Sequence, residues 1–211
     1  MGQQKLNRTS DNNDATNASN DIAKSKGKIF QRFKINEIVF LSILSAVLIV
    51  ATSVMPLVAE LTRVVFGIAQ LVTGLQLSFF ITIALMRVRK PFTITIIMML
   101  MGGLMLMMAF VMFLSNLFVL VVAETLVLLI FRGYQSNKAC FFGGAIVPPL
   151  ALVVPTCYNY ITAPEVFMAV TANPFLVVGM TLAVITIGIL GALLAVKVGS
   201  ELIKSGVMKN G

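Results

Sequence analysis

The sequence of 211 residues contains no histidine and no tryptophan, and only 11% of its residues are charged. The absence of histidine removes the commonest general acid–base side chain and a ligand of most catalytic zinc sites. One acidic residue, Glu124, lies within a long apolar run, and no second carboxylate accompanies it there. Paired-carboxylate catalysis is therefore not indicated. We expect a protein that is not an enzyme and that needs no cofactor.

Cysteines, nucleotide-binding motifs and basic faces are also scarce. Cys140 and Cys157 lie near opposite ends of one apolar segment, and a helix of that length separates them by roughly 25 Å, too far for a disulfide. No Gly-x-x-x-x-Gly-Lys-Ser/Thr motif is present, so the loop that holds nucleotide phosphates is lacking. The basic residues flank apolar runs instead of forming one face with aromatics, which argues against nucleic-acid binding.

Long apolar runs dominate what is present, since 58% of the residues are hydrophobic. This composition predicts an all-α integral membrane protein in a lipid bilayer. Its apolar segments predict six transmembrane helices, near residues 36–58, 64–86, 92–110, 113–131, 139–158 and 174–197. The run from Pro91 to Phe131 would measure about 60 Å as one helix, so it must turn back. The polar pair Ser115 and Asn116 predicts a turn close by.

The two ends of the chain are predicted to be cytoplasmic. Residues 1–34 are largely polar and lack the apolar core of a secretory signal, which predicts a disordered tail before a six-helix domain over residues 35–211. With the tail inside, fifteen of the sixteen Lys and Arg residues fall on the cytoplasmic side and only Arg63 falls outside. Cytoplasmic loops are enriched in these residues, so this topology is favoured.

Several stretches together resemble a known transporter family. They are "FKINEIVFLSILSAVLIVA" in the first span, "RVRKPF" before "ITIIMMLMGGLM", "LIFRGYQSNK" before a proline-rich fifth span, and "GILGALLAVKVGSELIKSGVMKNG" at the end. Over about residues 33–208 the chain resembles the substrate-binding S component of energy-coupling factor (ECF) transporters, of the MptD or Trep-Strep type.

The resemblance implies a multi-pass protein of the bacterial cytoplasmic membrane with an S-component-like bundle. Such a subunit binds a vitamin or cofactor-like small molecule from outside. It is expected to dock on a transmembrane T component, which two ABC-type ATPases drive. Because this sequence has no nucleotide-binding loop of its own, any active transport must draw on another subunit.

Small residues on the spans are candidates for helix contacts, because they let backbones approach closely in lipid. The resemblance assigns docking on the T component to Ser42 and Ala46, and to the stretch around Gly102 and Gly103; packing inside the chain is the alternative for Ser42 and Ala46. Small residues also share one face of the sixth span, where internal packing is favoured: Gly188, Gly191, Ala192, Ala195 and Gly199.

Ligand contacts are expected near the outer ends of the spans. Glu60 and Arg63 lie one turn apart in the first outer loop, where they could hold a carboxylate-bearing ligand or form only a surface ion pair. The second span carries three uncharged polar residues that fit either ligand contact or bonds between helices: Gln70, Thr73 and Gln76.

The fifth span ends "VVPTCYNYITAPEVF". Pro148, Pro149 and Pro155 each remove a backbone donor, so the helix is expected to kink and to leave carbonyl groups free beside a cavity. Tyr158, Asn159 and Tyr160 follow at the outer mouth, as stacking and hydrogen-bonding groups for a ligand or as an interfacial aromatic belt. Asn173 fits either a helix cap or an anion-binding helix start.

A carboxylate inside a span, such as Glu124, is costly and is by default a functional hypothesis. We favour a structural hydrogen bond, with Gln76 or Asn116 as the candidate partner, over ligand contact or proton relay. Asn116 is also a candidate ligand contact.

The stretch "MMLMGGLMLMMAFVM" raises two further alternatives. Five methionines lie three or four residues apart: Met98, Met101, Met105, Met108 and Met112. Thioethers select Cu(I), so a copper transporter is one alternative, and a haem or corrinoid transporter is a weaker one. Adaptable packing by flexible methionines is favoured, and a structural subunit that does not transport remains open.

Overall fold

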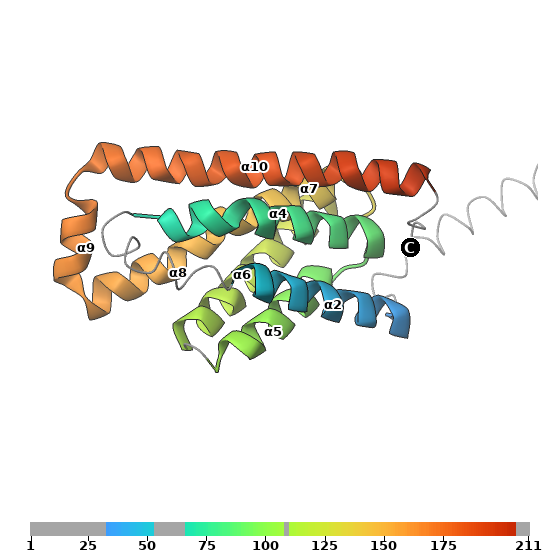
Figure 1. Ribbon diagram of the computed structural model, residues 1–211, viewed down its shortest axis with the longest axis horizontal. Helices are drawn as coiled ribbons and strands as arrows, with labels where there is room; N and C mark the ends of the chain where they lie inside the picture. The colour runs from blue at the N-terminus through green and yellow to red at the C-terminus, as the bar shows by residue number, and fades with distance from the viewer. Residues whose placement is uncertain (1–32, 53–65, 108–109, 206–211) are drawn as a thin grey trace, which may run out of the picture. The chain divides into compact units, whose positions relative to one another are not determined.

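The computed structural model describes residues 33–52, 66–107 and 110–205. Within these ranges the chain forms eight α-helices and no strand. With the labels of Figure 1, they are α2 (Ile35–Thr52), α4 (Ile68–Val88), α5 (Thr93–Met105), α6 (Phe110–Phe131), α7 (Asn137–Ala145), α8 (Val147–Thr162), α9 (Pro164–Thr171) and α10 (Pro174–Lys204).

Five helical runs are long and apolar enough to cross a membrane: α2, α4, α6, α7 with α8, and α10. A multi-pass all-α membrane protein is therefore confirmed at this level. The predicted third span corresponds to α5, which has 13 residues and measures about 20 Å, against about 30 Å for a hydrocarbon core. The six-span topology stays a prediction, as does the cytoplasmic placement of the ends, which lie outside the described residues.

The predicted turn between the third and fourth spans was misplaced. Helix α5 ends at Met105, a turn follows at Leu106 and Met107, and α6 begins at Phe110, so Ser115 and Asn116 lie within α6. Each of these side chains has a hydrogen-bond acceptor although its residue lies within the helix. Ser115 Oγ lies 3.4 Å from the Ala151 carbonyl oxygen, and Asn116 Nδ2 donates to the Met112 carbonyl at 2.8 Å. Polar residues that are satisfied in this way do not mark a boundary with water.

The fifth predicted span is a pair of helices, α7 and α8, which meet at Ile146 just before Pro148 and Pro149. A short helix that the sequence did not predict, α9, follows α8. It begins at Pro164, whose missing N–H costs nothing in the first turn. Helix α10 then runs to Lys204, beyond the end predicted for the sixth span.

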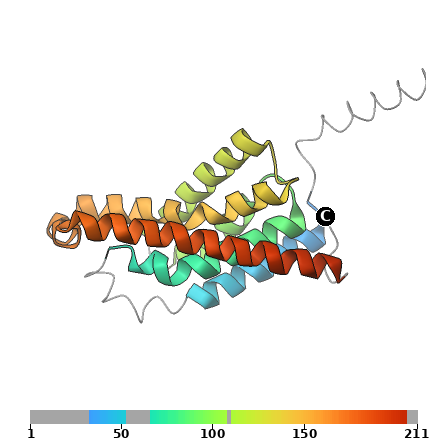
Figure 2. The same ribbon diagram turned by 90° about the horizontal axis from the view of Figure 1, so that it is seen from above.

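Helix α10 packs along α4 (Figures 1 and 2) through the predicted small-residue face. All five residues of that face are buried. A Cβ on Gly191 would lie 2.5 Å from the Leu75 carbonyl oxygen, and one on Gly188 would lie 2.7 Å from that of Ala145. Ser78 Oγ also donates to the Gly188 carbonyl at 2.6 Å. Internal packing of this face is confirmed, because no side chain fits at these crossings.

The described basic residues all lie toward one end of the bundle, where α2, α5 and α7 begin and where α4, α6 and α10 end (right side of Figure 1). They are Lys34, Arg87, Arg89, Lys90, Arg132, Lys138, Lys197 and Lys204. We call this the basic end. Such clustering is what the positive-inside rule expects of one side of a membrane protein.

Candidate functional site

The interior of the bundle contains a polar junction where α4, α6 and α8 meet. Pro155 lies inside α8 and has no N–H, so the Ala151 carbonyl one turn earlier loses its helical donor. Gln70 Nε2 from α4 donates to this carbonyl at 3.3 Å, and Ser115 Oγ from α6 donates to it at 3.4 Å. Pro155 thus frees the Ala151 carbonyl, as predicted, and side chains of two neighbouring helices donate to it. The cavity predicted beside it stays a prediction.

The other polar residues of α4 are also engaged. Gln76 Nε2 donates to the Ala51 carbonyl of α2 at 3.1 Å, whereas Thr73 Oγ1 donates to the Ala69 carbonyl of its own helix at 2.8 Å. Bonds between helices are therefore confirmed for Gln70 and Gln76. Thr73 differs, because its short hydroxyl reaches back along its own helix.

Tyr158, Asn159 and Tyr160 are exposed in the last turns of α8, at the end of the bundle away from the basic residues. The Tyr160 ring packs edge-on against Phe167 of α9, with centroids 5.3 Å apart. Asn173 accepts hydrogen bonds from the backbone N–H groups of Phe175 at 3.1 Å and Leu176 at 3.4 Å, which confirms that it caps α10.

Glu60 and Arg63 lie outside the described residues. The structure brings Gln70 next to Ser115, whereas Tyr158 follows Ala151 by about two turns of α8. These are the placements that the structure gives the predicted ligand residues of α4 and α8. Their binding role stays a prediction.

Glu124 of α6 forms hydrogen bonds with the start of α5. Its carboxylate accepts a hydrogen bond from the backbone N–H of Phe92 at 2.7 Å and lies 3.5 Å from Thr95 Oγ1. Phe92, the residue before α5, has φ of +69° and no side-chain cap, so a carboxylate from another helix takes the place of an N-cap. The predicted hydrogen bond to another helical segment is present, but its partners are Phe92 and Thr95 and not Gln76 or Asn116. The choice between a structural and a functional role stays a prediction.

Tyr134, in the loop between α6 and α7, faces Glu124 and was not singled out in the sequence. Its side chain is fully buried, and its hydroxyl makes no hydrogen bond of standard geometry within the described residues. Burial, and secondly the Glu124 carboxylate, raises the pKa of the phenol above its ordinary value. The only sequence signal was a tyrosine after Gly133 in a polar turn.

Ion pairs and hydrogen bonds join the helix ends at the basic end. Lys90 Nζ lies 2.6 Å from Glu37 Oε2, with the two side chains 8% and 16% exposed, so the α4–α5 turn is tied to α2. Arg89 donates to Asn137 Oδ1 at 2.8 Å, and the Arg87 guanidinium lies 4.3 Å from the centre of the Phe40 ring. No local pattern could have paired Glu37 with Lys90, which lies 53 residues further along the chain.

The candidate docking residues differ in their surroundings. Ser42 and Ala46 are exposed on α2, which excludes the alternative that they pack inside the described part of the chain. Gly102 is buried, and a Cβ there would lie 3.2 Å from Asn116 Cβ, whereas Gly103 is exposed with nothing within 4 Å. Gly102 thus serves the α5–α6 contact, and Gly103 is open to a partner or to lipid.

The methionine stripe is divided between core and surface. Met98, Met101 and Met105 are buried in the apolar core, Met112 is 44% exposed, and Met108 lies outside the described residues. Packing accounts for the buried members. The two free cysteines agree with the sequence: Cys140 is buried and Cys157 is exposed.

Gln70 and Gln76 join neighbouring helices through hydrogen bonds, whereas the side chains of Tyr158, Asn159 and Tyr160 and the small residues Ser42 and Ala46 are exposed. No protein-family model, curated protein or solved structure matches this chain.

Proposed function

We propose that this chain is the substrate-binding S component of an ECF-type importer in a bacterial cytoplasmic membrane. It would bind a vitamin or cofactor-like small molecule from outside and deliver it together with a T component and two ABC-type ATPases. The proposal includes a topology in which the chain crosses the membrane six times and has both ends in the cytoplasm. The helical bundle with five apolar runs of spanning length supports it.

The observation that carries the proposal is the outward placement of Ser42 and Ala46. Both lie on one exposed face of α2, in an apolar strip with Ile35 (79% exposed), Val39 (50%) and Val50 (73%). Small residues within such a strip leave a shallow track where a second helix can approach closely. The resemblance assigns docking to this pair, and no neighbouring helix of the described chain covers it.

One exposed group of residues offers the best candidates for contact with the ligand, and Gln70 is a less accessible one. Tyr158, Asn159 and Tyr160 are exposed at the end away from the basic residues, and their rings and amide can stack on and hydrogen-bond to a planar molecule. Gln70 lies deeper and would have to exchange its bond to Ala151 for one to the ligand.

The proposal is tested by assembly and by ligand content. The tagged chain, purified in mild detergent from its native membrane, is expected to bring with it a T component and two ATPases. Mass spectrometry of the extracted protein is expected to find a bound small molecule. Absence of all these subunits from the purified protein would contradict the proposal.

Variants on α2 and α5 refine the assembly test. Ala46→Leu and Gly103→Leu place bulk on exposed small positions and are expected to reduce recovery of the T component while leaving ligand binding by the isolated chain intact. Gly179→Leu is the matched control, because Gly179 is also exposed with nothing within 4 Å but lies on α10. Equal losses in all three variants would mean that α2 and α5 have no special part in docking.

A further inference from the structure

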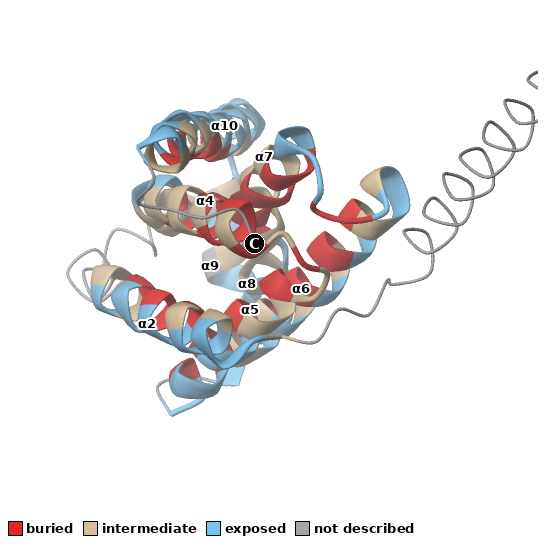
Figure 3. Cartoon of the chain, turned by 90° about the vertical axis from the view of Figure 1, so that its right-hand side faces the viewer, coloured by how far each residue is buried: buried red, intermediate tan, exposed pale blue. Residues whose placement is uncertain are grey.

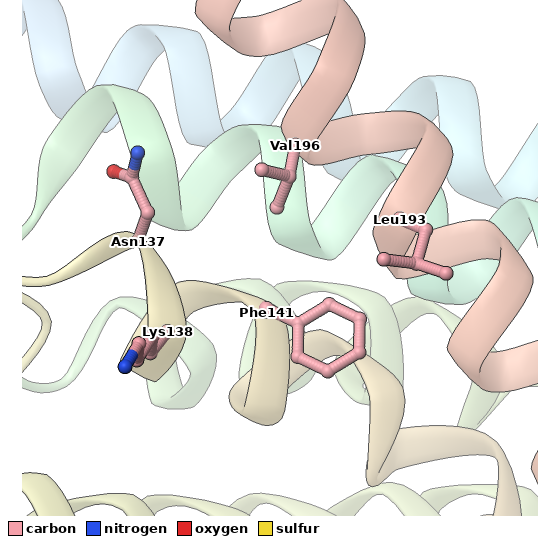
Figure 4. A pocket seen from close by; sticks show the side chains of 5 residues that line it. All are labelled: Asn137, Lys138, Phe141, Leu193 and Val196. Carbon is pink, nitrogen blue, oxygen red and sulfur yellow. The ribbon is translucent and has the colours of Figure 1, made fainter.

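A shallow groove lies between α7 and α10 near the basic end of the bundle. It has a volume of about 210 Å³ and is lined by Asn137, Lys138 and Phe141 of α7 and by Leu193 and Val196 of α10 (Figure 4). Leu193 is 52% exposed, so the groove opens outward along two helices of spanning character. On helices of spanning character, this open apolar side is available to lipid.

The groove combines an apolar floor with a basic rim. Phe141, Leu193 and Val196 form the floor, and Lys138 lies at the rim, exposed. Lys197 is also exposed and follows Leu193 by four residues, which places it one turn nearer the basic end on the same side of α10. Within the described residues neither lysine forms an ion pair.

A third cation reinforces the positive rim. The Arg89 guanidinium donates to Asn137 Oδ1 at 2.8 Å, and Asn137 itself lines the groove. Lys138 thus lines the groove directly, Lys197 lies one turn beyond Leu193, and Arg89 is joined to the groove through Asn137. No carboxylate is among the lining residues. Such a site complements a molecule with a negative head and an apolar tail.

We propose that this groove binds an anionic phospholipid. Part of one acyl chain lies on the apolar floor between α7 and α10, and the head-group phosphate lies at Lys138 with Lys197 beside it. Basic pockets between transmembrane helices recognise acidic lipid head groups in this way. A zwitterionic lipid also carries a phosphate, but its cationic choline compensates that charge and is repelled by the same lysines.

The site is separate from the exposed face of α2. Helix α2 packs on α4 and α5, whereas the groove is formed by α7 and α10. Figure 3 shows α2 on a different side of α4 from α10. A lipid bound here leaves Ser42 and Ala46 free, so the inference holds whether or not the chain docks on a T component.

The test is competition between phosphatidylglycerol and phosphatidylcholine for the full-length protein, followed by native mass spectrometry in mild detergent. We expect the wild type to retain phosphatidylglycerol preferentially. Each lysine at the rim contributes roughly a fivefold preference for an acidic lipid, so Lys138→Gln should reduce the preference about fivefold, and Lys138→Gln with Lys197→Gln should reduce it further.

Lys34→Gln is the matched control, because it removes the same charge from the same end of the bundle but just before α2. It should leave the preference unchanged. The proposal is overturned if the double variant keeps the wild-type preference, or if Lys34→Gln reduces it as much as Lys138→Gln does. The second result would mean that the basic end attracts lipid as a whole, without a defined site.

A second measurement retains both lysines and so does not depend on the folding of their variants. A fluorescent label on Ile189→Cys, one turn before Leu193 on α10 and 39% exposed, is introduced with Cys157→Ser to remove the exposed native thiol. Brominated phosphatidylglycerol should quench this label more than brominated phosphatidylcholine does. The same label on Ile43→Cys of α2 should show no difference, and equal quenching by both lipids at position 189 would also refute the site.

Discussion

The polar junction at Ala151 predicts an energetic coupling between Gln70 and Pro155, two residues from different helices. Pro155 has no backbone N–H, so it cannot donate the hydrogen bond that the Ala151 carbonyl would otherwise accept within its helix. Gln70 Nε2 donates a hydrogen bond to this carbonyl instead, at 3.3 Å. If this account is correct, the contribution of Gln70 to stability depends on the proline. Gln70→Leu, which keeps the bulk and removes the donor, should therefore cost more in the wild type than in a Pro155→Ala background.

The expected magnitudes follow from hydrogen bonds within membranes. Side-chain bonds between transmembrane helices average about 0.6 kcal/mol and reach about 1.7 kcal/mol. Gln70→Leu should destabilise the wild type by about 1 kcal/mol, since only the 3.4 Å contact with Ser115 then remains. With alanine at position 155 the restored N–H serves the carbonyl, and the same change should cost about 0.3 kcal/mol, which leaves a coupling energy of about 0.7 kcal/mol.

A double-mutant cycle measures this coupling by equilibrium unfolding in mixed micelles, followed by far-ultraviolet circular dichroism. Thr73→Val is the matched control. Thr73 lies one turn from Gln70 but bonds to its own helix, so its effect should add to that of Pro155→Ala. A coupling energy of zero for Gln70 and Pro155 would refute the account of the junction, whatever Pro155→Ala does alone.

Three further predictions concern other packed positions, each measured as the free energy of unfolding in micelles. Glu124→Gln retains an oxygen acceptor for the Phe92 N–H, whereas Glu124→Leu removes the acceptor that Glu124 supplies and should cost about 1 kcal/mol more than Glu124→Gln; equal losses would contradict the capping role. Gly188→Ala should destabilise by about 1–3 kcal/mol because its Cβ meets the Ala145 carbonyl, and Gly179→Ala, in open space, should show no loss. Burial raises the pKa of Tyr134, so the folded state holds the phenol proton that the unfolded chain loses near pH 10. Its contribution is complete below about pH 10 and falls as the pH rises above that value; Tyr134→Phe should remove this decline, and an unchanged pH profile would argue against the assignment.

The sequence predicted the helices whose boundaries carry a physical signal. Arg87 and Arg89 mark the end of α4, and the small-residue face of α10 correctly indicated internal packing. The end of α5 carried no such signal, because Leu106 and Met107 in the turn are as apolar as the helix before them. The short helix α9 lies between the fifth and sixth predicted spans, and its 8 residues are too few to form an apolar run of spanning length, although Pro164 is a suitable first residue for a helix.

In the candidate site, the sequence predicted only those effects that a residue has on residues close to it in the chain. Asn173 before Pro174 indicated a cap, and Pro155 indicated a freed carbonyl, since both effects are local. The partners of Glu124 and Glu37 depend on how distant helix ends come together. A single sequence does not show which distant helix ends come together.

The interior polar groups already make hydrogen bonds to one another, and this limits the positions at which the proposed ligand could bind. In lipid a freed carbonyl is costly unless a donor meets it, and the Ala151 carbonyl already has Gln70 and Ser115. A ligand that entered this junction would have to replace those bonds with equivalent ones and would gain little from the exchange. Groups that face outward carry no such cost. The first substitutions aimed at ligand binding should therefore be made at Tyr158, Asn159 and Tyr160, where ring stacking and amide recognition can be removed without breaking the contacts that hold α4, α6 and α8 together.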